Sequence, residues 1–258
     1  TGFIAVASIL AVASGFGGAG IAAETGPWWL PFVASILLGA VAGLASLPFA
    51  PRVPTVRAAI TDSHDGPSPP LRHAPGVARA AALAVFLHFA VATSVAGVFG
   101  AFVLRTLDLP LLRGGILLVP AAGAGGLAML LGGRLSRPGR RLLEVAAVYV
   151  AGSAGAAALA FADSEVAFAL SALPLGLALG GAVPILNAAV LDVATSSGRT
   201  GRSLGWMFLA QGMGTVGGPA LAGGIMALRG PREALAAIAA AYLAGALVDA
   251  LNNRRTGL

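Results

Sequence analysis

The side chain best suited to proton chemistry in this chain is His88, which lies inside the apolar stretch "AVFLHFAVATS". An ionisable residue in so apolar a stretch is a candidate for function, and histidine exchanges a proton near physiological pH. The pattern indicates a role in proton transfer or substrate contact. The alternative is a neutral histidine that hydrogen-bonds between helices. Ser94, six positions later, shares the face of His88 only loosely.

Two amides, Asn187 and Gln211, are the other polar side chains expected deep within apolar segments. Such amides either contact a substrate or join helices through hydrogen bonds worth roughly 0.6–2 kcal/mol. No Asp or Glu lies in the middle of an apolar segment. Glu144, Asp192 and Asp249 lie near segment ends, and we expect them to pair with nearby arginines.

Metal and cofactor chemistry is not expected from these residues. The chain has no cysteine, and His64 in "DSHD" lies in a polar stretch where a solvated loop is preferred over a metal site. The apolar segments contain neither Asp-x-x-Asp nor two histidines at helical spacing, patterns that membrane-embedded enzymes use to hold metals. We therefore expect no metal, no cofactor and no enzymatic activity.

The composition indicates that lipid surrounds most of the chain. Hydrophobic residues make up 57% of the 258 residues and charged residues only 10%, against about a quarter charged in soluble domains. The mean hydropathy is +0.89 and the pI about 11.4. In a soluble protein, a pI this high would suggest binding to nucleic acid. Here the arginines lie between apolar runs, so they indicate membrane topology instead.

Eight segments are apolar over the roughly 20 residues that a membrane-spanning helix needs. The sequence therefore predicts an all-α polytopic membrane protein. The chain begins at Thr1, already inside an apolar run, and we expect it to be a piece that lacks earlier helices. The eight segments are approximately residues 2–23, 28–49, 79–103, 114–133, 143–162, 165–190, 204–228 and 233–250.

The polar stretch at residues 51–78 is rich in proline and glycine, so it is predicted to be a linker. When the loops are assigned alternately to the two sides of the membrane, twelve arginines fall on the side of the linker and four on the other. Cytoplasmic loops carry the excess of positive charge. The linker and the C-terminus are therefore predicted to be cytoplasmic.

Two glycine-rich motifs stand out. The loop "GGRLSRPGRR" (residues 132–141) contains four arginines, and its glycines permit a tight turn. A second motif, "GTVGGPALAGG", begins at Gly214, and its small residues match those of residues 14–23 at a constant offset of 200. Segments that match at this spacing are six helices apart, which is the spacing of transporters built from two parallel halves.

These motifs resemble those of the Major Facilitator Superfamily. The loop resembles the family's Gly-x-x-x-Asp-Arg-x-Gly-Arg-Arg motif, although Ser136 stands where the family prefers Asp. The second motif resembles the antiporter signature Gly-x-x-x-Gly-Pro-x-x-Gly-Gly, although it lies in helix eleven instead of helix five. The matching residues are Gly132, Arg137, Gly139, Arg140 and Arg141 in the loop, and Gly214, Gly218, Pro219 and Gly223 in the helix.

The resemblance covers the C-terminal two thirds of such a transporter, helices five to twelve of twelve. It implies three parts: the last two helices of one half (1–50), the linker (51–78) and a complete six-helix half (79–258). In the family, the seventh helix, which would carry His88, lines the central cavity. The arginine loop latches neighbouring helices, and Ser136 offers this latch only a neutral hydrogen bond.

The resemblance also implies a secondary active transporter of the inner membrane, expected to be a monomer. Its expected partners are a small-molecule substrate, the proton and the lipid bilayer, with no nucleic acid. We expect proton-coupled efflux of small amphipathic molecules. Other readings remain: an uptake symporter or uniporter of the same family, a membrane-embedded enzyme, or the permease subunit of an ATP-driven importer.

Overall fold

The computed structural model describes residues 75–196 and 200–256, and the side chains of residues 77–194 and 204–255. Segments 2–23 and 28–49, with the repeat at residues 14–23 and most of the linker, lie outside the described residues. The described part is helical. Its elements are α3 (Pro75–Arg105), α4 (Leu111–Leu117), α5 (Val119–Leu135), α6 (Arg141–Ala160), α7 (Glu165–Ser196), α8 (Thr200–Arg229) and α9 (Pro231–Thr256).

The six apolar segments expected after the linker correspond to these helices, with two differences. The helix α3 begins at Pro75, inside the stretch predicted to be linker, because proline is well suited to the first turn of a helix. The segment 114–133 is bent by 41° where α4 meets α5. Pro120 lies at the start of α5, and it lacks the N–H that a continuous helix would use there.

Helices α3, α6, α7 and α9 are long and apolar enough to cross a membrane, and the bent pair α4–α5 would make a fifth such span among the described residues. The helix α8 has the necessary length, but its glycines and Gln211 lower its hydropathy. These helices agree with the predicted all-α membrane bundle.

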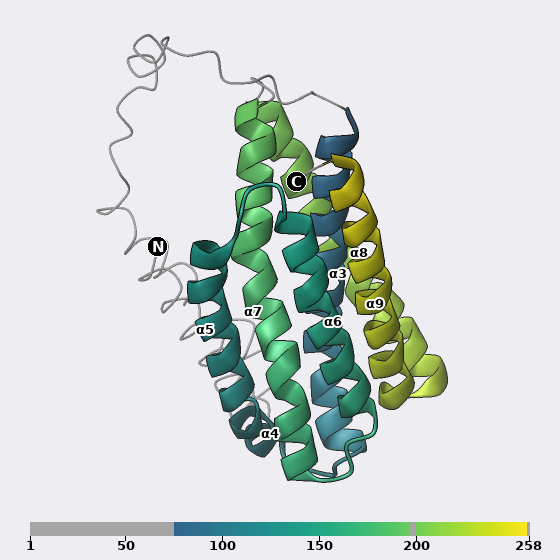
Figure 1. Ribbon diagram of the computed structural model, residues 1–258. Coiled ribbons are helices and arrows are strands. Elements are labelled where there is room, and N and C mark those ends of the chain that lie inside the picture. Colours follow the sequence, from purple (N-terminus) through teal and green to yellow (C-terminus); the bar gives the residue numbers. More distant parts are fainter. Residues whose placement is uncertain (1–74, 197–199, 257–258) are drawn as a thin grey trace, which may run out of the picture.

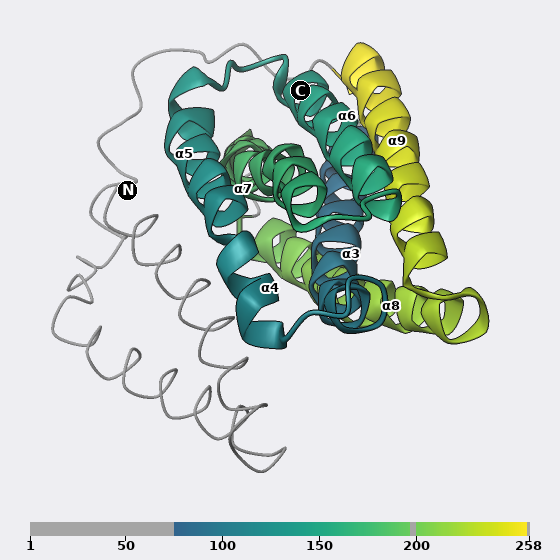
Figure 2. The same cartoon turned by 90° about the horizontal axis from the view of Figure 1, so that it is seen from below.

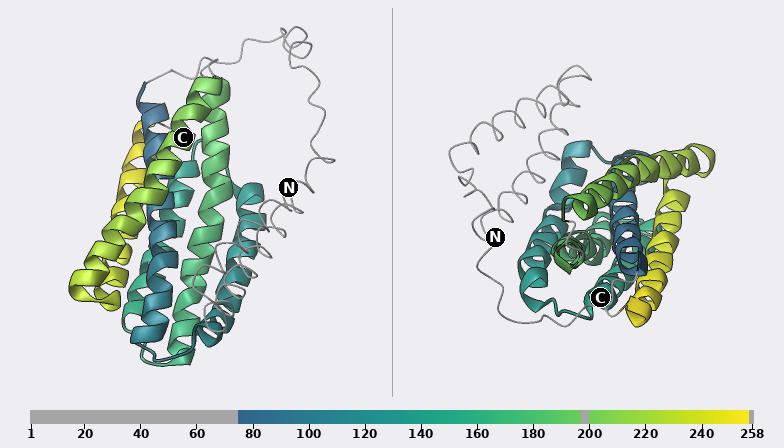
Figure 3. Two further views of the ribbon diagram at one scale, coloured as in Figure 1. Left: turned by 180° about the vertical axis from the view of Figure 1, so that it is seen from behind. Right: turned by 90° about the horizontal axis from the view of Figure 1, so that it is seen from above.

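The helices form a bundle with α3 and α7 side by side in its interior (Figure 1). The helix α7 packs against α5 and α6, while α3 packs against α8 and α9. Seen from the end of the bundle, α5, α6, α9 and α8 surround this central pair (Figure 2; Figure 3, right). The N-terminal end of α3, the α5–α6 loop and the C-terminal end of α9 lie at the same end of the bundle (Figure 1).

The opposite end contains two ion pairs that involve predicted outer arginines. Arg113 of α4 binds Glu165 at the start of α7, with 2.8 Å between Nη2 and Oε1. Arg232 of α9 pairs with Asp163 in the α6–α7 loop. Two of the four arginines predicted on this side are therefore paired with acids of the same end.

Candidate functional site

The α5–α6 loop (residues 136–140) contains the arginine motif and forms a tight turn. The Ser136 backbone N–H donates to the carbonyl of Gly132 at 3.0 Å, and Gly139 has φ of 83°, a conformation that glycine adopts without strain. The Ser136 hydroxyl is buried and has no hydrogen-bond partner among the described residues, so it does not supply the neutral hydrogen bond expected from the sequence.

Glu144, an acid of the next helix, supplies a hydrogen bond to the loop that the Ser136 hydroxyl does not. The Arg137 backbone N–H donates to the Glu144 carboxylate, 3.1 Å from Oε1. Glu144 is in the first turn of α6, where a negative charge is favourable because it faces the positive end of the helix dipole. From the sequence, Glu144 was expected to pair with an arginine side chain. The structure instead shows it bound to an arginine backbone.

Two further helices hold the loop. Arg141 at the start of α6 pairs with Asp192 of α7, with 3.0 Å between Nη1 and Oδ2. Asn253 of α9 accepts from the Leu143 backbone N–H at 3.2 Å and donates to the Gly139 carbonyl at 3.4 Å. The loop is therefore linked to both α7 and α9 at this end of the bundle. The pairing of Asp192 agrees with expectation, whereas the contribution of Asn253 was not anticipated.

The glycine and proline motif lies where α8 crosses α3. A Cβ atom added at Gly214 or Gly218 would lie closer than 3.0 Å to the backbone of α3, at Phe86 and Ala90 respectively. Real Cβ atoms essentially never approach that closely, so only glycine permits this crossing. Pro219 lies inside α8. Gly223 is different, because a Cβ atom added there would meet nothing within 4 Å.

Asn187 and Gln211 lie together in one cavity. It has a volume of about 260 Å³ and is bounded by α3, α7 and α8. The two amides are the polar side chains among its described lining residues, and the walls are apolar, with Phe89, Met207 and Phe208 as the largest members. This inner cavity can hold an apolar molecule while two amides contact its polar group.

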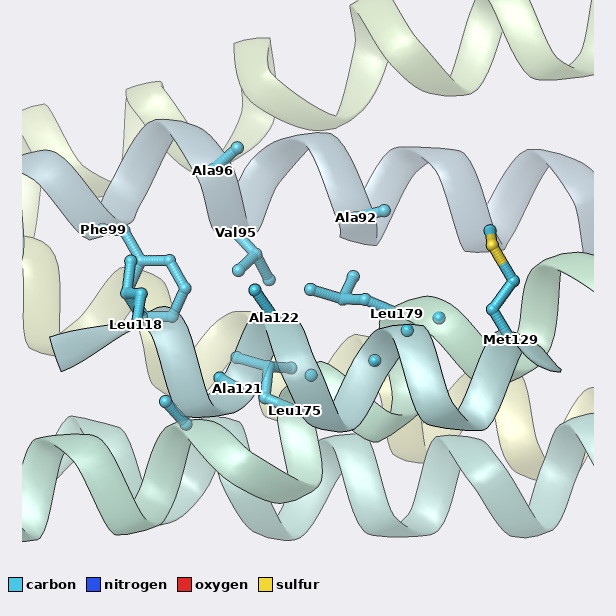
Figure 4. A pocket seen from close by; sticks show the side chains of 15 residues that line it. Ala92, Val95, Ala96, Phe99, Leu118, Ala121, Ala122, Met129, Leu175 and Leu179 are labelled. Carbon is cyan, nitrogen blue, oxygen red and sulfur yellow. The ribbon is translucent and has the colours of Figure 1, made fainter. Parts of the chain in front are cut away.

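A second cavity of about 310 Å³ lies between α3, α5 and α7. Figure 4 shows its side chains: Val95 and Phe99 from α3, Met129 from α5 and Leu175 from α7 point into it, and every labelled side chain is hydrocarbon apart from the Met129 sulfur. This outer cavity is enclosed where Gly125 of α5 meets Gly176 and Gly180 of α7. It offers volume and apolar contact but no polar side chain.

The two cavities lie one after the other along the same pair of helices. On α3, the inner cavity is lined by Val85 and Phe89 and the outer one by Ala92, Ala96 and Phe99. This spacing of three and four residues is that of one helical face. The helix α7 follows the same pattern, with lining residues 172–180 facing the outer cavity and 183–191 the inner one. A single α3–α7 face therefore connects both cavities.

The other two sequence candidates lie elsewhere. His88 is buried, with 1% of its surface exposed, and its ring stacks parallel to that of Tyr149 on α6, with 6.1 Å between centroids. The Ser94 hydroxyl donates to the Ala90 carbonyl of its own helix at 2.6 Å. Neither residue lines the cavities described above. His88 thus faces the α6 side of α3, away from the two cavities described above.

Sequence analysis overlooked Phe89, Met207 and Phe208 because apolar residues are common throughout the chain. It also placed Asp249 among the arginine-paired acids. The structure instead shows Asp249 fully buried, with neither carboxylate oxygen hydrogen-bonded to a described residue. The described residues contain no cluster of three or more His, Asp or Glu side chains that could hold a metal ion. His64 lies outside them.

Comparison with known proteins shows the family to which the chain belongs. A family model described as the Major Facilitator Superfamily matches residues 1–219. No curated protein and no solved structure shows a significant match. The family match covers most of the 258 residues and agrees with the bundle of apolar helices. The chain therefore belongs to the Major Facilitator Superfamily of secondary transporters and is a multi-pass membrane protein.

Proposed function

We propose that the protein exports small amphipathic molecules across the inner membrane in exchange for protons, and that the substrate binds in the inner cavity. The observation that carries this proposal is the meeting of Asn187 and Gln211 in a cavity that is otherwise apolar. A site with two neutral amides and no fixed charge suits a molecule that has a large apolar part and a small polar group.

The shared face of α3 and α7 supports a path for such a molecule. An amphipathic substrate held by the two amides at the inner cavity can extend its apolar part toward the outer cavity, where the wall is hydrocarbon. Export is favoured over uptake because the α8 motif at Gly214, Gly218 and Pro219 resembles an antiporter signature. The close crossing of α3 and α8 at this motif borders the inner cavity.

Residues 79–258 are proposed to form one complete six-helix half, joined by the linker to the half that includes residues 1–50. The unequal distribution of arginine supports a cytoplasmic position for the linker, the α5–α6 loop and the C-terminus. In this orientation the inner cavity lies on the cytoplasmic side, where an exporter collects its substrate. We propose that the transporter acts as a monomer.

Removing both amides should weaken substrate binding without preventing membrane insertion. In the full-length protein, the double variant Asn187→Leu with Gln211→Leu preserves approximate volume but removes two hydrogen-bonding groups. A hydrogen bond contributes about 0.5–1.5 kcal/mol, so an amphipathic fluorescent dye that binds the wild type should bind roughly 5- to 150-fold more weakly. Dye titration of the purified protein in detergent measures this change.

The matched control is Leu243→Met, which exchanges an exposed apolar side chain of α9 that lines neither cavity. Volume-conserving apolar exchanges usually cost less than 1.5 kcal/mol, so this variant should retain dye affinity close to that of the wild type. Equal affinity of the wild type and the double variant would contradict a substrate site at the two amides.

The proposed orientation predicts which side of the membrane each exposed position faces. Ser164 in the α6–α7 loop and Arg254 in the last turn of α9 are both exposed, and these two segments lie at opposite ends of the bundle (Figure 1). A cysteine introduced as Ser164→Cys should react with a membrane-impermeant maleimide in intact cells. A cysteine introduced as Arg254→Cys should react only after the membrane is opened. Labelling of Arg254→Cys from outside would reverse the proposed topology.

A further inference from the structure

Four polar side chains are buried together in the interior of the bundle, outside both cavities. His88 lies on α3, Tyr149 on α6, and Tyr242 and Asp249 on α9, and none is more than 1% exposed. The rings of His88 and Tyr149 stack in parallel, and those of Tyr149 and Tyr242 meet edge-on with 5.4 Å between centroids. Asp249 follows Tyr242 by seven residues and Gly245 by four, so it shares the face of α9 that packs against Tyr149. We refer to these four residues as the polar cluster.

Glycines bring the helices close enough to form the cluster. A Cβ atom added at Gly245 of α9 would lie 3.1 Å from the Tyr149 ring, and one added at Gly152 of α6 would lie 3.1 Å from the Tyr242 ring. Both tyrosine rings therefore lie directly against the backbone of the opposite helix. The Tyr149 hydroxyl donates to the Ala84 carbonyl of α3 at 3.4 Å. This hydrogen bond links α3 to the pair formed by α6 and α9.

The cluster extends from near the cytoplasmic end of the bundle toward its middle. Asp249 is seven residues from the end of α9 at Thr256, which corresponds to about 10 Å at 1.5 Å per residue. Tyr242 is about 21 Å from that end by the same measure. His88 is thirteen residues from the start of α3 at Pro75, about 20 Å deep. Protonatable groups thus occur at two successive depths.

Several polar atoms of the cluster have no partner among the described residues: His88 Nδ1, the Tyr242 hydroxyl and both Asp249 carboxylate oxygens. Burying an ionised, unpaired carboxylate in an apolar interior is very unfavourable. Buried polar groups without partners are uncommon in folded proteins and call for an explanation, such as an unplaced water or a functional role. The concentration of four such atoms in one interface points to a function.

The charged groups on the surrounding helices do not neutralise Asp249. On α6, Arg141 pairs with Asp192 of α7, and Glu144 binds the Arg137 backbone. Arg79 of α3 and the α9 residues Arg254 and Arg255 are exposed at the end of the bundle. On α8, the titratable side chain that the structure describes is Arg229, which lies at the opposite end. Among the described residues, the tyrosines of the cluster are therefore the titratable groups on the helix faces that pack around Asp249.

We propose that Asp249 is a proton-binding group of this transporter, buried with the polar cluster where α3, α6 and α9 meet. This inference rests on the proton coupling of the proposed function. In the packed arrangement Asp249 is a neutral acid. When α9 separates from α3 and α6 and water enters, the carboxyl O–H bond breaks and the proton passes to water on the cytoplasmic side.

The helix α3 connects this proton site to the proposed substrate site. His88 belongs to the cluster, and the next residue, Phe89, lines the inner cavity. Their rings meet edge-on with 5.3 Å between centroids. A shift of α3 that opens the cluster therefore also moves a wall of the inner cavity. The proton site on α9 and the substrate site therefore lie on different sides of α3, and they do not compete for a common position.

The test uses full-length protein in proteoliposomes with a pH-sensitive dye enclosed. Asp249→Asn preserves size and neutrality but cannot release a proton. We expect substrate-driven proton movement to fall at least tenfold, while dye binding and substrate exchange without a proton gradient stay within about twofold of wild type. Asp249→Glu retains the acid and should preserve proton movement. Asp192→Asn, the matched control, removes a carboxylate paired with Arg141 and should leave the number of protons moved per substrate unchanged.

The outcomes separate this inference from the proposed function. If the wild type moves no protons with its substrate, the proposed proton coupling is wrong. If the wild type moves protons and Asp249→Asn does so equally, the proton site is not Asp249, although proton-coupled export stands. If Asp249→Asn inserts poorly, Asp249→Glu is compared with the wild type instead. If Asp249→Glu inserts correctly but no longer moves protons, the proposal is also overturned.

Discussion

Replacing Gly218 with alanine is expected to abolish transport and to lower the thermal stability of the purified protein. The added methyl group would lie closer than 3.0 Å to the Ala90 carbonyl oxygen of α3, so the two helices would have to separate. Overpacking of this kind typically costs 1–3 kcal/mol and occasionally more, which corresponds to a lowering of Tm by about 5 °C in a chain of this size. Fluorescence-detected thermal unfolding and dye transport measure the two effects.

The adjacent glycine supplies the control. A Cβ atom added at Gly217 would meet nothing within 4 Å, and alanine is the better helix former by about 1 kcal/mol. Gly217→Ala should therefore be neutral or slightly stabilising and should retain transport. The two substitutions are chemically identical and lie one position apart. If both variants behave alike, the close crossing of α3 and α8 does not determine activity.

Gly180→Ala is expected to have a similarly large effect through the other close crossing. A Cβ atom at Gly180 would lie closer than 3.0 Å to the carbonyl oxygen of Gly125, because α7 and α5 meet there backbone to backbone. Separating these helices would also widen the outer cavity, which both glycines line. We expect a Tm about 5 °C lower and increased binding of an apolar dye that is larger than the substrate.

Gly181→Ala is its matched control. The nearest atom to a Cβ at Gly181 is the Ala128 Cβ at 3.5 Å, an ordinary van der Waals distance, so this variant should keep wild-type stability. The critical result is which of the two variants, Gly180→Ala or Gly181→Ala, has the higher Tm. A Gly181→Ala variant that is less stable than Gly180→Ala would show that α5 and α7 do not cross at Gly125 and Gly180.

The helices could be predicted from the sequence because hydropathy over 20 residues depends only on local composition. The bend between α4 and α5 was missed for the same reason, since an averaged window does not register the effect of Pro120 on its neighbours. The α5–α6 turn was predicted from its glycines and arginines. Its attachment to Asn253 was not, because a contact over 110 residues leaves no local pattern.

The site was predictable only in part. Asn187 and Gln211 were recognisable as amides at membrane depth, but their meeting in one cavity depends on how α8 crosses α3 and α7, which the glycines alone do not specify. His88 was recognisable as a buried histidine, whereas the face it occupies depends on the packing of α6. Asp249 seemed to lie near a polar helix end. The small residues of α9 allow neighbouring helices to approach and cover it.

The attachment of the α5–α6 loop to Asn253 has a consequence for biosynthesis. Among the described residues, the Leu143 amide and the Gly139 carbonyl bond to the Asn253 side chain of α9, and a ribosome completes α6, α7 and α8 before Asn253 exists. Until then, the start of α6 must rely on water or lipid head groups to satisfy these atoms. The α5–α6 loop therefore cannot make these contacts while α6, α7 and α8 enter the bilayer one by one. Its final arrangement is set when the last helix leaves the translocon.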